Sequence, residues 1–421
     1  MTALPADVDY VLPLRWLTAR PDDETELAAY LGWLSHHARV VVVDGSPREV
    51  FERHHRRLSS VVTHVRPDPW PARNGKVAGV HTGLRLARSE RVVLADDDVR
   101  YDKDSLRQVV SLLDEADLVG PQNVFRPLPW HAAWDSARSL LNRAVVADYP
   151  GTFGIRRSTF REMGGYDGDV LFENLELMRT VRAHGGRVVR PLGVYVVRRP
   201  PTADHFWGQR VRQAYDDIAQ PWRLAMFLPM LPTALLGGRA GRRLVAAALG
   251  ASVGVAEAGR RRAGGAAHFP ARVPLLAPAW VLERSVCSWL AVGQAALLGG
   301  VRYGDRRLGV AAHSVRRLRQ AALERALVVA GGAEPAAVRA VAEGLERRPA
   351  AAAQRHGAST GGDLMPVDVG DPEGATQNER AVGVRRQLRR VVATGWVATV
   401  LTGGLAGGLA GHVGAAARRG R

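Results

Sequence analysis

Short apolar segments alternate with helix-like segments from residue 8 to about residue 200, and this alternation restricts the fold more than any other feature of the sequence. The apolar segments are short and rich in valine, which is typical of buried strands. The predicted strands are YVLPL (10–14), RVVVVDGS (39–46), RVVLADDD (91–98), ADLVGPQNVF (116–125) and GRVVRPLGVYVV (186–197), with predicted helices at 24–36 and 104–116. Strands that alternate with helices pack through right-handed crossovers. The pattern therefore predicts an α/β fold with a doubly wound, mostly parallel sheet.

Acidic side chains follow two of the predicted strands, at the edge where ligands bind in sheets of this kind. Asp44 ends one strand, and Asp96, Asp97 and Asp98 end another. Alternation along an extended segment places Asp96 and Asp98 on one side and Asp97 on the other. A divalent cation would use such a pair of hard oxygen ligands. Two other interpretations stay open: a turn or helix cap, which most aspartates after a strand form, and a phosphatase with Asp96 as its nucleophile.

The chain is strongly basic, with a net charge of +17, and all but two of its 58 basic residues are arginine. Such a charge favours an anionic partner. Aromatic residues are only 6% of the chain and the arginines flank apolar stretches, which favours a membrane surface over nucleic acid. Cys287 is the only cysteine, so an intrachain disulfide and a cysteine-rich zinc site are excluded. The first 16 residues lack the pattern of a cleavable signal peptide, which predicts a cytoplasmic first domain.

After residue 220 the sequence changes to three apolar segments flanked by arginines, at 224–238, 244–259 and 273–300. A spanning helix needs roughly 20 apolar residues, and only the third is long enough, although Glu283 and Arg284 interrupt it. The alternative is a set of buried helices in a second soluble domain. The predicted division is 1–220 (catalytic α/β domain), 221–305 (membrane-associated helices), 306–348 (a helical Arg/Ala-rich segment) and 349–421 (a low-complexity linker, then a Gly-rich apolar segment).

Four ordered motifs between residues 8 and 215 resemble those of family-2 glycosyltransferases with the GT-A fold, in particular bacterial membrane-associated members. RNGKVAGVHTG (73–83) resembles the segment before the metal-binding strand, and VVVVDGS (40–46) is one residue shorter than the family's strand end. Residues 151–189 contain a GGYD turn followed by FENLEL, as in the acceptor half. QRVRQ (209–213) resembles the family's Q-x-x-R-W motif, with Gln213 in place of tryptophan.

The resemblance implies a nucleotide-diphosphate sugar donor, a divalent cation (Mg²⁺ or Mn²⁺) and roles for individual residues. Asp98 would hold the cation against the leaving diphosphate, with Asp96 as a second metal ligand. The remaining implied residues are Asp44, Lys76, Asp96 and Asp97 for the donor, and Gly164, Gly165, Tyr166, Glu176, Gln209 and Arg212 for the acceptor.

The sequence departs from the family at the residue that accepts the acceptor's proton: Asn174 stands where the family has an aspartate. Glu173 or Glu176 would take that role, and Glu173 is our preferred candidate. The alternative is that both glutamates only stabilise a helix N-terminus through the helix dipole. The expected function is an inverting, metal-dependent sugar transfer to a lipid-linked or cell-envelope glycan acceptor, at the cell membrane with the catalytic domain in the cytoplasm and without nucleic acid. The alternative is a sugar-nucleotide-binding membrane protein of the same fold with lost or altered catalysis.

Overall fold

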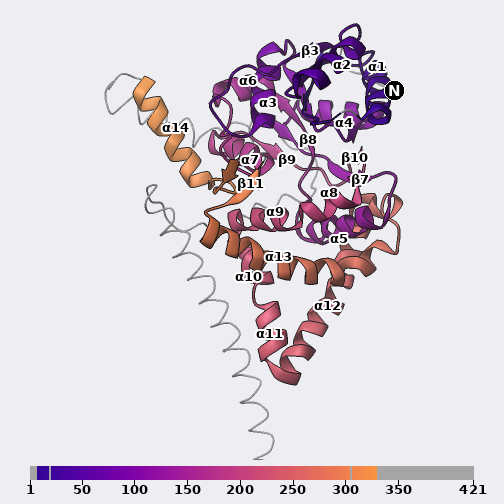
Figure 1. The fold of residues 1–421 in the computed structure, drawn as a ribbon, viewed down its shortest axis with the longest axis vertical. Coiled ribbons are helices and arrows are strands. Elements are labelled where there is room, and N and C mark those ends of the chain that lie inside the picture. The colour runs from indigo at the N-terminus through magenta and orange to yellow at the C-terminus, as the bar shows by residue number, and fades with distance from the viewer. Residues whose placement is uncertain (1–6, 19, 304–305, 330–421) are drawn as a thin grey trace, which may run out of the picture.

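The computed structural model describes residues 7–18, 20–303 and 306–329. Within these residues, a mixed sheet with the strand order β3-β2-β1-β4-β8-β6-β9 forms the centre of the α/β half (Figure 1). Its strands are β1 (Val8–Leu14), β2 (Arg39–Asp44), β3 (Thr63–Val65), β4 (Arg91–Ala95), β6 (Leu118–Val119), β8 (Thr152–Arg156) and β9 (Val188–Val189). The first four are parallel neighbours, whereas β8 runs antiparallel to β4 and β6. The predicted α/β fold with a mostly parallel sheet is thus confirmed.

Both faces of the sheet are covered by helices, which explains the continuous valine runs in its strands. Along β2, Val41 and Val43 belong to one core cluster and Val40 and Val42 to the other. The first cluster is completed by α3 (Gly75–Leu86) and α7 (Glu173–Ala183), and the second by α1 (Pro21–Leu34), α2 (Arg48–Leu58) and α4 (Lys103–Leu112). The acidic ends of β2 and β4 therefore lie at one edge of a sheet that helices cover on both faces.

A small second sheet lies beside the end of β4. It has the order β5-β10-β7, with β5 (Val99–Arg100), β7 (Gln122–Phe125) and β10 (Tyr195–Arg198). The predicted strands 116–125 and 186–197 are each divided between the two sheets, so their prediction as single strands was wrong. Each division contains a proline, Pro121 or Pro191, and proline cannot donate a ladder hydrogen bond. The pairing of β10 with β5 brings residues near 198 next to residues near 99.

A third sheet has two strands, β11 (Val301–Tyr303) and β12 (Arg306–Leu308). Helices form most of the rest of the described chain. They are α5 (Trp130–Val145), α6 (Arg157–Glu162), α8 (Ala203–Gly208), α9 (Arg210–Tyr215), α10 (Pro221–Phe227), α11 (Met230–Leu236), α12 (Gly238–Arg261), α13 (Ala277–Leu298) and α14 (Val315–Val329). α13 lies along α9 and α5, and α12 packs on α5. The α11–α12 hairpin extends away from the body of the molecule (Figure 1).

The three apolar segments of the sequence take different forms in this helical part. Segment 224–238 is divided between α10 and α11, and segment 244–259 lies inside α12. Within the described residues, one helical stretch, Val273–Leu298, is long and apolar enough to cross a membrane. Of the charged pair that interrupts it, Arg284 is buried: it is 2% exposed and lies 3.3 Å from the Asp217 carboxylate. Spanning by these helices stays a prediction.

The predicted low-complexity linker (349–378) and the Gly-rich apolar segment (391–417) lie outside the described residues, as does the part of the predicted segment 306–348 after residue 329.

Candidate functional site

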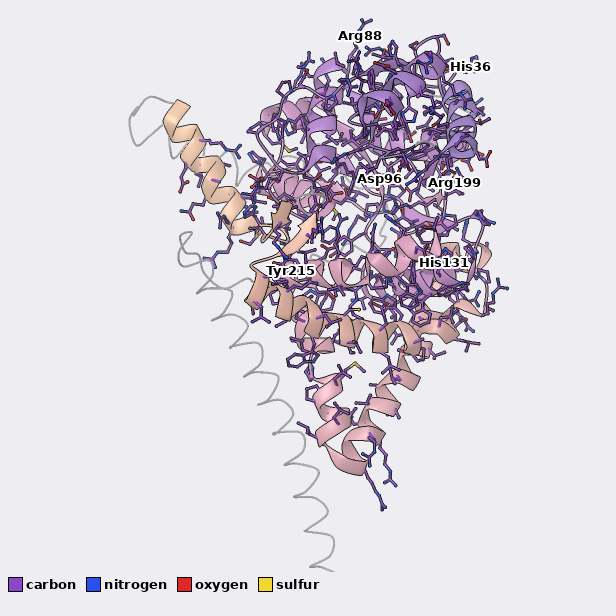
Figure 2. All side chains as sticks on the ribbon, viewed as in Figure 1. His36, Arg88, Asp96, His131, Arg199 and Tyr215 are labelled. Atoms are coloured by element: carbon purple, nitrogen blue, oxygen red, sulfur yellow. The ribbon has the colours of Figure 1, made fainter. Side chains whose placement is uncertain are left out.

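The three aspartates after β4 lie on a turn between β4 and β5, which we call the acid loop (Asp96–Asp98). Asp96 and Asp98 both contact the Arg198 guanidinium, and Asp97 accepts a hydrogen bond from the Trp16 indole. The predicted division of the three side chains between two directions is therefore present. In the view of Figure 2, Asp96 lies between the α/β half and the helical half. The acid loop thus lies where the two halves of the molecule meet.

Lys76 connects the acid loop to the start of α7. It stands on the first turn of α3, whose N-terminus is capped by the Asn74 side chain. Its Nζ lies 2.6 Å from Asp96 Oδ1, 2.8 Å from Glu173 Oε1 and 3.3 Å from Asn174 Oδ1. Burial alone would lower the pKa of Lys76, but the charges of Asp96 and Glu173 outweigh burial and raise that pKa above its usual value. Lys76 is therefore a permanent cation in the centre of the site.

Arg198 is the functional residue that the sequence reasoning missed. It ends β10, and its Nε lies 3.0 Å from each Asp98 oxygen while its Nη2 lies 2.5 Å from Asp98 Oδ2. The same Nη2 is 3.6 Å from Asp96 Oδ2. Burial lowers the pKa of Arg198, but Asp98 and Asp96 outweigh it and raise the pKa above its usual value. The arginine pair ending VYVVRR is the only sequence signal, in a chain where arginine is everywhere.

Glycine at position 151 allows Arg198 to approach the acid loop. A Cβ atom there would lie 2.6 Å from Arg198 Nη1. The Gly151 backbone also accepts a hydrogen bond from Asp96 N (3.3 Å) and donates one to Asn123 Oδ1 (3.1 Å). A larger residue would displace the guanidinium from both carboxylates.

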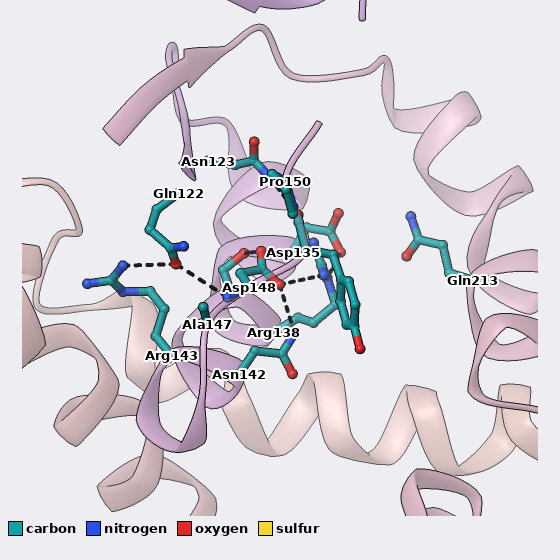
Figure 3. A network of polar contacts seen from close by, with 12 residues as sticks. Gln122, Asn123, Asp135, Arg138, Asn142, Arg143, Ala147, Asp148, Pro150 and Gln213 are labelled. Atoms are coloured by element: carbon teal, nitrogen blue, oxygen red, sulfur yellow. Dashed lines mark hydrogen bonds and ion pairs between the residues drawn. The ribbon is translucent and has the colours of Figure 1, made fainter. Parts of the chain in front are cut away.

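A polar network around Asp148 fixes the position of the chain just before Gly151 (Figure 3). Asp148 accepts hydrogen bonds from Arg138 (2.9 Å), Ser139 (2.5 Å) and Asn142 (2.7 Å), all on α5. Its backbone N–H donates to Gln122 on β7 at 3.3 Å. The network ties the chain before Gly151 to α5 and to the second sheet, so that the floor of the site is held from two sides.

Asp44, predicted to bind the donor, is fully buried at the end of β2. Its Oδ1 accepts from Ser46 N (2.8 Å), and its Oδ2 lies 2.6 Å from His54 Nδ1 and 3.2 Å from His64 Nε2. Burial would raise the pKa of Asp44, but the histidine and Ser46 hydrogen bonds outweigh it and lower the pKa. The ligand atoms of Asp44, His54 and His64 lie within 4.8 Å of one another, the spacing of a metal site. In this structure both Asp44 oxygens are thus bound by neighbouring groups of the protein.

The GGYD turn packs against α3. Gly164 and Gly165 have φ angles of 68° and 79°, a region that favours glycine. A Cβ atom on Gly165 would lie 1.9 Å from the His81 ring, on which the Tyr166 ring also stacks. Tyr166 is buried and, with Lys76, Asp96 and Asn174, lines a small cavity at the centre of the site. The turn therefore belongs to the wall of the site.

The start of α7 separates the two glutamates considered as proton acceptors. Glu173 faces Lys76, and Asn174 donates to Pro150 O at 3.1 Å. Glu176 points the other way: it is fully buried and accepts from His313 N (2.7 Å), and its other oxygen lies 2.9 Å from His313 Nδ1. Glu176 thus attaches the segment before α14 to α7, and it offers no exposed oxygen to an acceptor.

Gln209 and Arg212 lie at the start of α9 and differ in their surroundings. Gln209 contacts His205 near the surface. Arg212 lies over the ring of Tyr303, 4.8 Å from its centroid, and the Tyr303 hydroxyl donates to Asn74 Oδ1 at 3.0 Å. Because Asn74 caps the helix that carries Lys76, Arg212 belongs to the same charged site.

Residues 34–169 match the model of the family described as glycosyl transferase family 2. They contain the acid loop and Lys76 but end before α7. No curated protein matches the sequence.

Two solved structures illustrate the distant likeness of the fold. The mannosyltransferase PcManGT from Pyrobaculum calidifontis, in complex with GDP-Man and Mn²⁺, is 18% identical, with a TM-score of 0.38 over 84% of this chain and 89% of that one. Glucosyl-3-phosphoglycerate synthase from Mycobacterium tuberculosis is 16% identical, with a TM-score of 0.32 over 48% of this chain and 75% of that one. At these values neither likeness determines what this chain binds.

Proposed function

We propose that this chain, which belongs to glycosyl transferase family 2 through residues 34–169, moves a sugar from a nucleotide-diphosphate donor to a lipid-linked or cell-envelope glycan acceptor. The observation that carries the proposal is the convergence of the acid loop, Lys76 and Arg198 in front of the α7 N-terminus. In such a site the positively charged side chains of Lys76 and Arg198 would bind a diphosphate, and the carboxylates hold both side chains in position. Charge that develops on a leaving diphosphate is stabilised by groups arranged in this way.

The acid loop fits a divalent cation by the chemistry of its donors. Asp96 and Asp98 turn to the same side, toward one guanidinium, and Mg²⁺ or Mn²⁺ takes carboxylate oxygens together with substrate phosphates. When bound, the cation offsets the charge of the departing diphosphate. Lys76 and Arg198 lie within reach of the same phosphates and would add positive charge from two sides.

The helical half supports a membrane-associated acceptor. Most of the exposed large apolar side chains in the described part of the chain lie between residues 222 and 298. On the α11–α12 hairpin, Leu235 and Leu236 are 74% and 78% exposed beside the exposed arginines Arg239, Arg242 and Arg243. Apolar side chains next to arginines are typical of helices that lie in the interface of anionic membranes. We propose that these helices bring the site to the cytoplasmic face of the cell membrane.

A second candidate function is a sugar-nucleotide-binding protein of the same fold without sugar transfer. It is favoured by Asn174, whose amide cannot accept a proton and is bound to Lys76 and Pro150. The two candidates share donor binding and differ in turnover.

Calorimetry with a panel of nucleotide-diphosphate sugars, with and without MnCl₂, tests donor binding. We expect metal-dependent binding of at least one donor that Asp98→Ala abolishes. Asp114→Ala is the matched control, because Asp114 is an exposed carboxylate that pairs with Arg91 away from the site. Sugar transfer from that donor to detergent-extracted membrane lipids then separates the two functions. Absence of metal-dependent binding to every donor would refute the proposal.

A further inference from the structure

Two buried oxygen atoms on one face of α9 and the turn after it lack hydrogen-bond donors. Gln213 Oε1 and Asp216 Oδ1 are both inaccessible, and neither accepts a hydrogen bond from any residue in the described ranges. Gln213 lies in α9, and Asp216 begins the short 3₁₀ helix Asp216–Ala219. Residues three apart in a helix lie on the same face. A buried hydrogen-bond acceptor atom without a hydrogen-bond donor is unfavourable. This pair of oxygens therefore indicates a binding place for a ligand with hydroxyl groups.

This pair of oxygens belongs to the acceptor side of the site. Asp216 lies within electrostatic reach of Glu173 at the start of α7 and of Arg212, one helical turn before it. Arg212 in turn stacks on Tyr303, whose hydroxyl is bonded to the Asn74 cap of α3. Asp216 therefore shares its electrostatic surroundings with Glu173 and Arg212.

The carboxylate at the start of α7 is already engaged. Glu173 Oε1 lies 2.8 Å from Lys76 Nζ, and the next residue is the amide Asn174. In that ion pair, Glu173 holds the lysine that would meet the diphosphate. Asp216 differs, because it forms no ion pair within the described chain and its Oδ1 is buried without a hydrogen-bond donor.

We propose that Asp216 accepts the proton of the acceptor hydroxyl, while Gln213 accepts a hydrogen bond from a neighbouring hydroxyl of the acceptor. The inference rests on the proposed sugar transfer. In the step, the acceptor oxygen forms a bond to the anomeric carbon and the bond from that carbon to the diphosphate oxygen breaks. The diphosphate leaves with the electron pair, and the hydroxyl proton moves to Asp216 Oδ1. Asp216 would thereby supply the carboxylate that Asn174 does not.

The surroundings of Asp216 suit it for this step near neutral pH. Burial raises the pKa of Asp216 to about 8; the positive charge of Arg212 lowers it, Asp217 and Glu173 raise it, and Arg284 on α13 lowers it. A general base acts best when its pKa lies near the working pH. Since the ionised form is the active one, kcat/KM should rise with pH and level off above about pH 8.

The test compares Asp216→Asn with Glu173→Gln and the wild type, measuring release of nucleoside diphosphate from the donor found by calorimetry, with detergent-extracted membrane lipids as acceptor. We expect Asp216→Asn to lower kcat by about 10²–10⁴-fold, to leave the donor Kd within twofold, and to remove the rise of the pH profile. Glu173→Gln should weaken donor binding and keep that rise. Asp22→Asn, at an exposed position on α1, is the control.

A second readout does not depend on turnover. In infrared spectra recorded between pH 6 and 10, the wild type should show a carboxylic acid C=O band that disappears near pH 8 and is missing in Asp216→Asn. Wild-type turnover with an unchanged Asp216→Asn rate and pH profile would overturn the inference and leave the proposed function standing. A wild type that binds donor without turnover in any acceptor extract would instead count against the proposed function.

Discussion

At the scale of single residues, the site is a cluster of charges that compensate one another. Asp96 and Glu173 share Lys76, and Asp98 is held by Arg198. The sequence predicted the acids and Lys76, because they lie in ordered motifs at strand and helix ends. It did not predict Arg198, because only the pairing of β10 with β5 brings residue 198 beside residue 98. It also could not show that both Asp44 oxygens are bound by His54, His64 and Ser46.

We expect Arg198 to compete with a divalent cation for Asp96 and Asp98, and Arg198→Ala tests this competition. Without the guanidinium, Asp96 and Asp98 repel each other, so Mn²⁺ should bind more tightly in the absence of nucleotide. The same variant should bind a nucleotide diphosphate more weakly, because one cation of the site is lost. The free energy of unfolding should fall by only about 1–2 kcal/mol, since the pair is partly exposed. Calorimetric titrations with MnCl₂ and then with UDP and GDP measure both effects.

Arg85→Ala is the control, because Arg85 forms an ion pair with Asp68 that is exposed and away from the acid loop. If Arg198→Ala leaves the Mn²⁺ affinity unchanged, or weakens it, Arg198 does not compete with the metal.

Gly165 carries a backbone constraint that alanine would violate. Its φ of 79° and the His81 ring in the place of a Cβ atom predict that Gly165→Ala lowers the free energy of unfolding by about 2–3 kcal/mol. Gly193→Ala is the matched control, since nothing lies within 4 Å of a Cβ atom there. Urea unfolding followed by circular dichroism compares the two. Equal unfolding free energies for Gly165→Ala and Gly193→Ala would show that the turn accommodates a Cβ atom without loss of stability.

At the scale of elements, the sequence predicted best where local pattern and tertiary contacts agree. β1, β2 and β4 were found because valine runs between helices are strands in almost any context. β8 was missed: residues 151–189 were interpreted through their motifs, and its antiparallel position between β4 and β6 depends on partners distant in sequence. For α13 the composition indicated a spanning segment, whereas its charged residues pack inward on α9 and Leu282, Val286 and Leu290 remain exposed.

The inward charge of α13 predicts how that helix is attached. Arg284 Nη1 donates to Gln213 O at 2.5 Å and lies 3.3 Å from Asp217 Oδ2. The other Asp217 oxygen, Oδ1, lies 2.7 Å from Arg223 Nε. Removing a buried partner of such a pair costs about 3 kcal/mol, so Arg284→Ala should lower the unfolding free energy by about that amount. Arg242→Ala, at an exposed position on α12, should change it by less than about 0.5 kcal/mol. Denaturant titration measures the unfolding free energy of both variants. Equal midpoints for Arg284→Ala and Arg242→Ala would mean that α13 is held by apolar contacts alone.

At the scale of the whole molecule, charge and apolar surface are distributed unequally. The α/β half buries its apolar residues in two clusters on either side of the sheet. The helical half exposes apolar side chains, both along α13 and on the α11–α12 hairpin that extends from the body (Figure 1). The arginines that flank its apolar segments predict that this half faces a membrane, and that stays a prediction. The sequence could not predict that the hairpin projects, because that depends on how α12 packs on α5.

This distribution predicts binding to anionic vesicles through the hairpin. The wild type should sediment with vesicles containing phosphatidylglycerol, and replacing Arg239, Arg242 and Arg243 with glutamine should weaken binding by about 100-fold, since each arginine near an anionic surface contributes about 1 kcal/mol. The double variant Leu235→Asp/Leu236→Asp should weaken binding to neutral and anionic vesicles alike, because it removes apolar contact. Leu17→Asp is the matched control: Leu17 is 67% exposed but lies in the α/β half. Vesicle binding that these hairpin variants leave intact would place the membrane contact elsewhere in the chain.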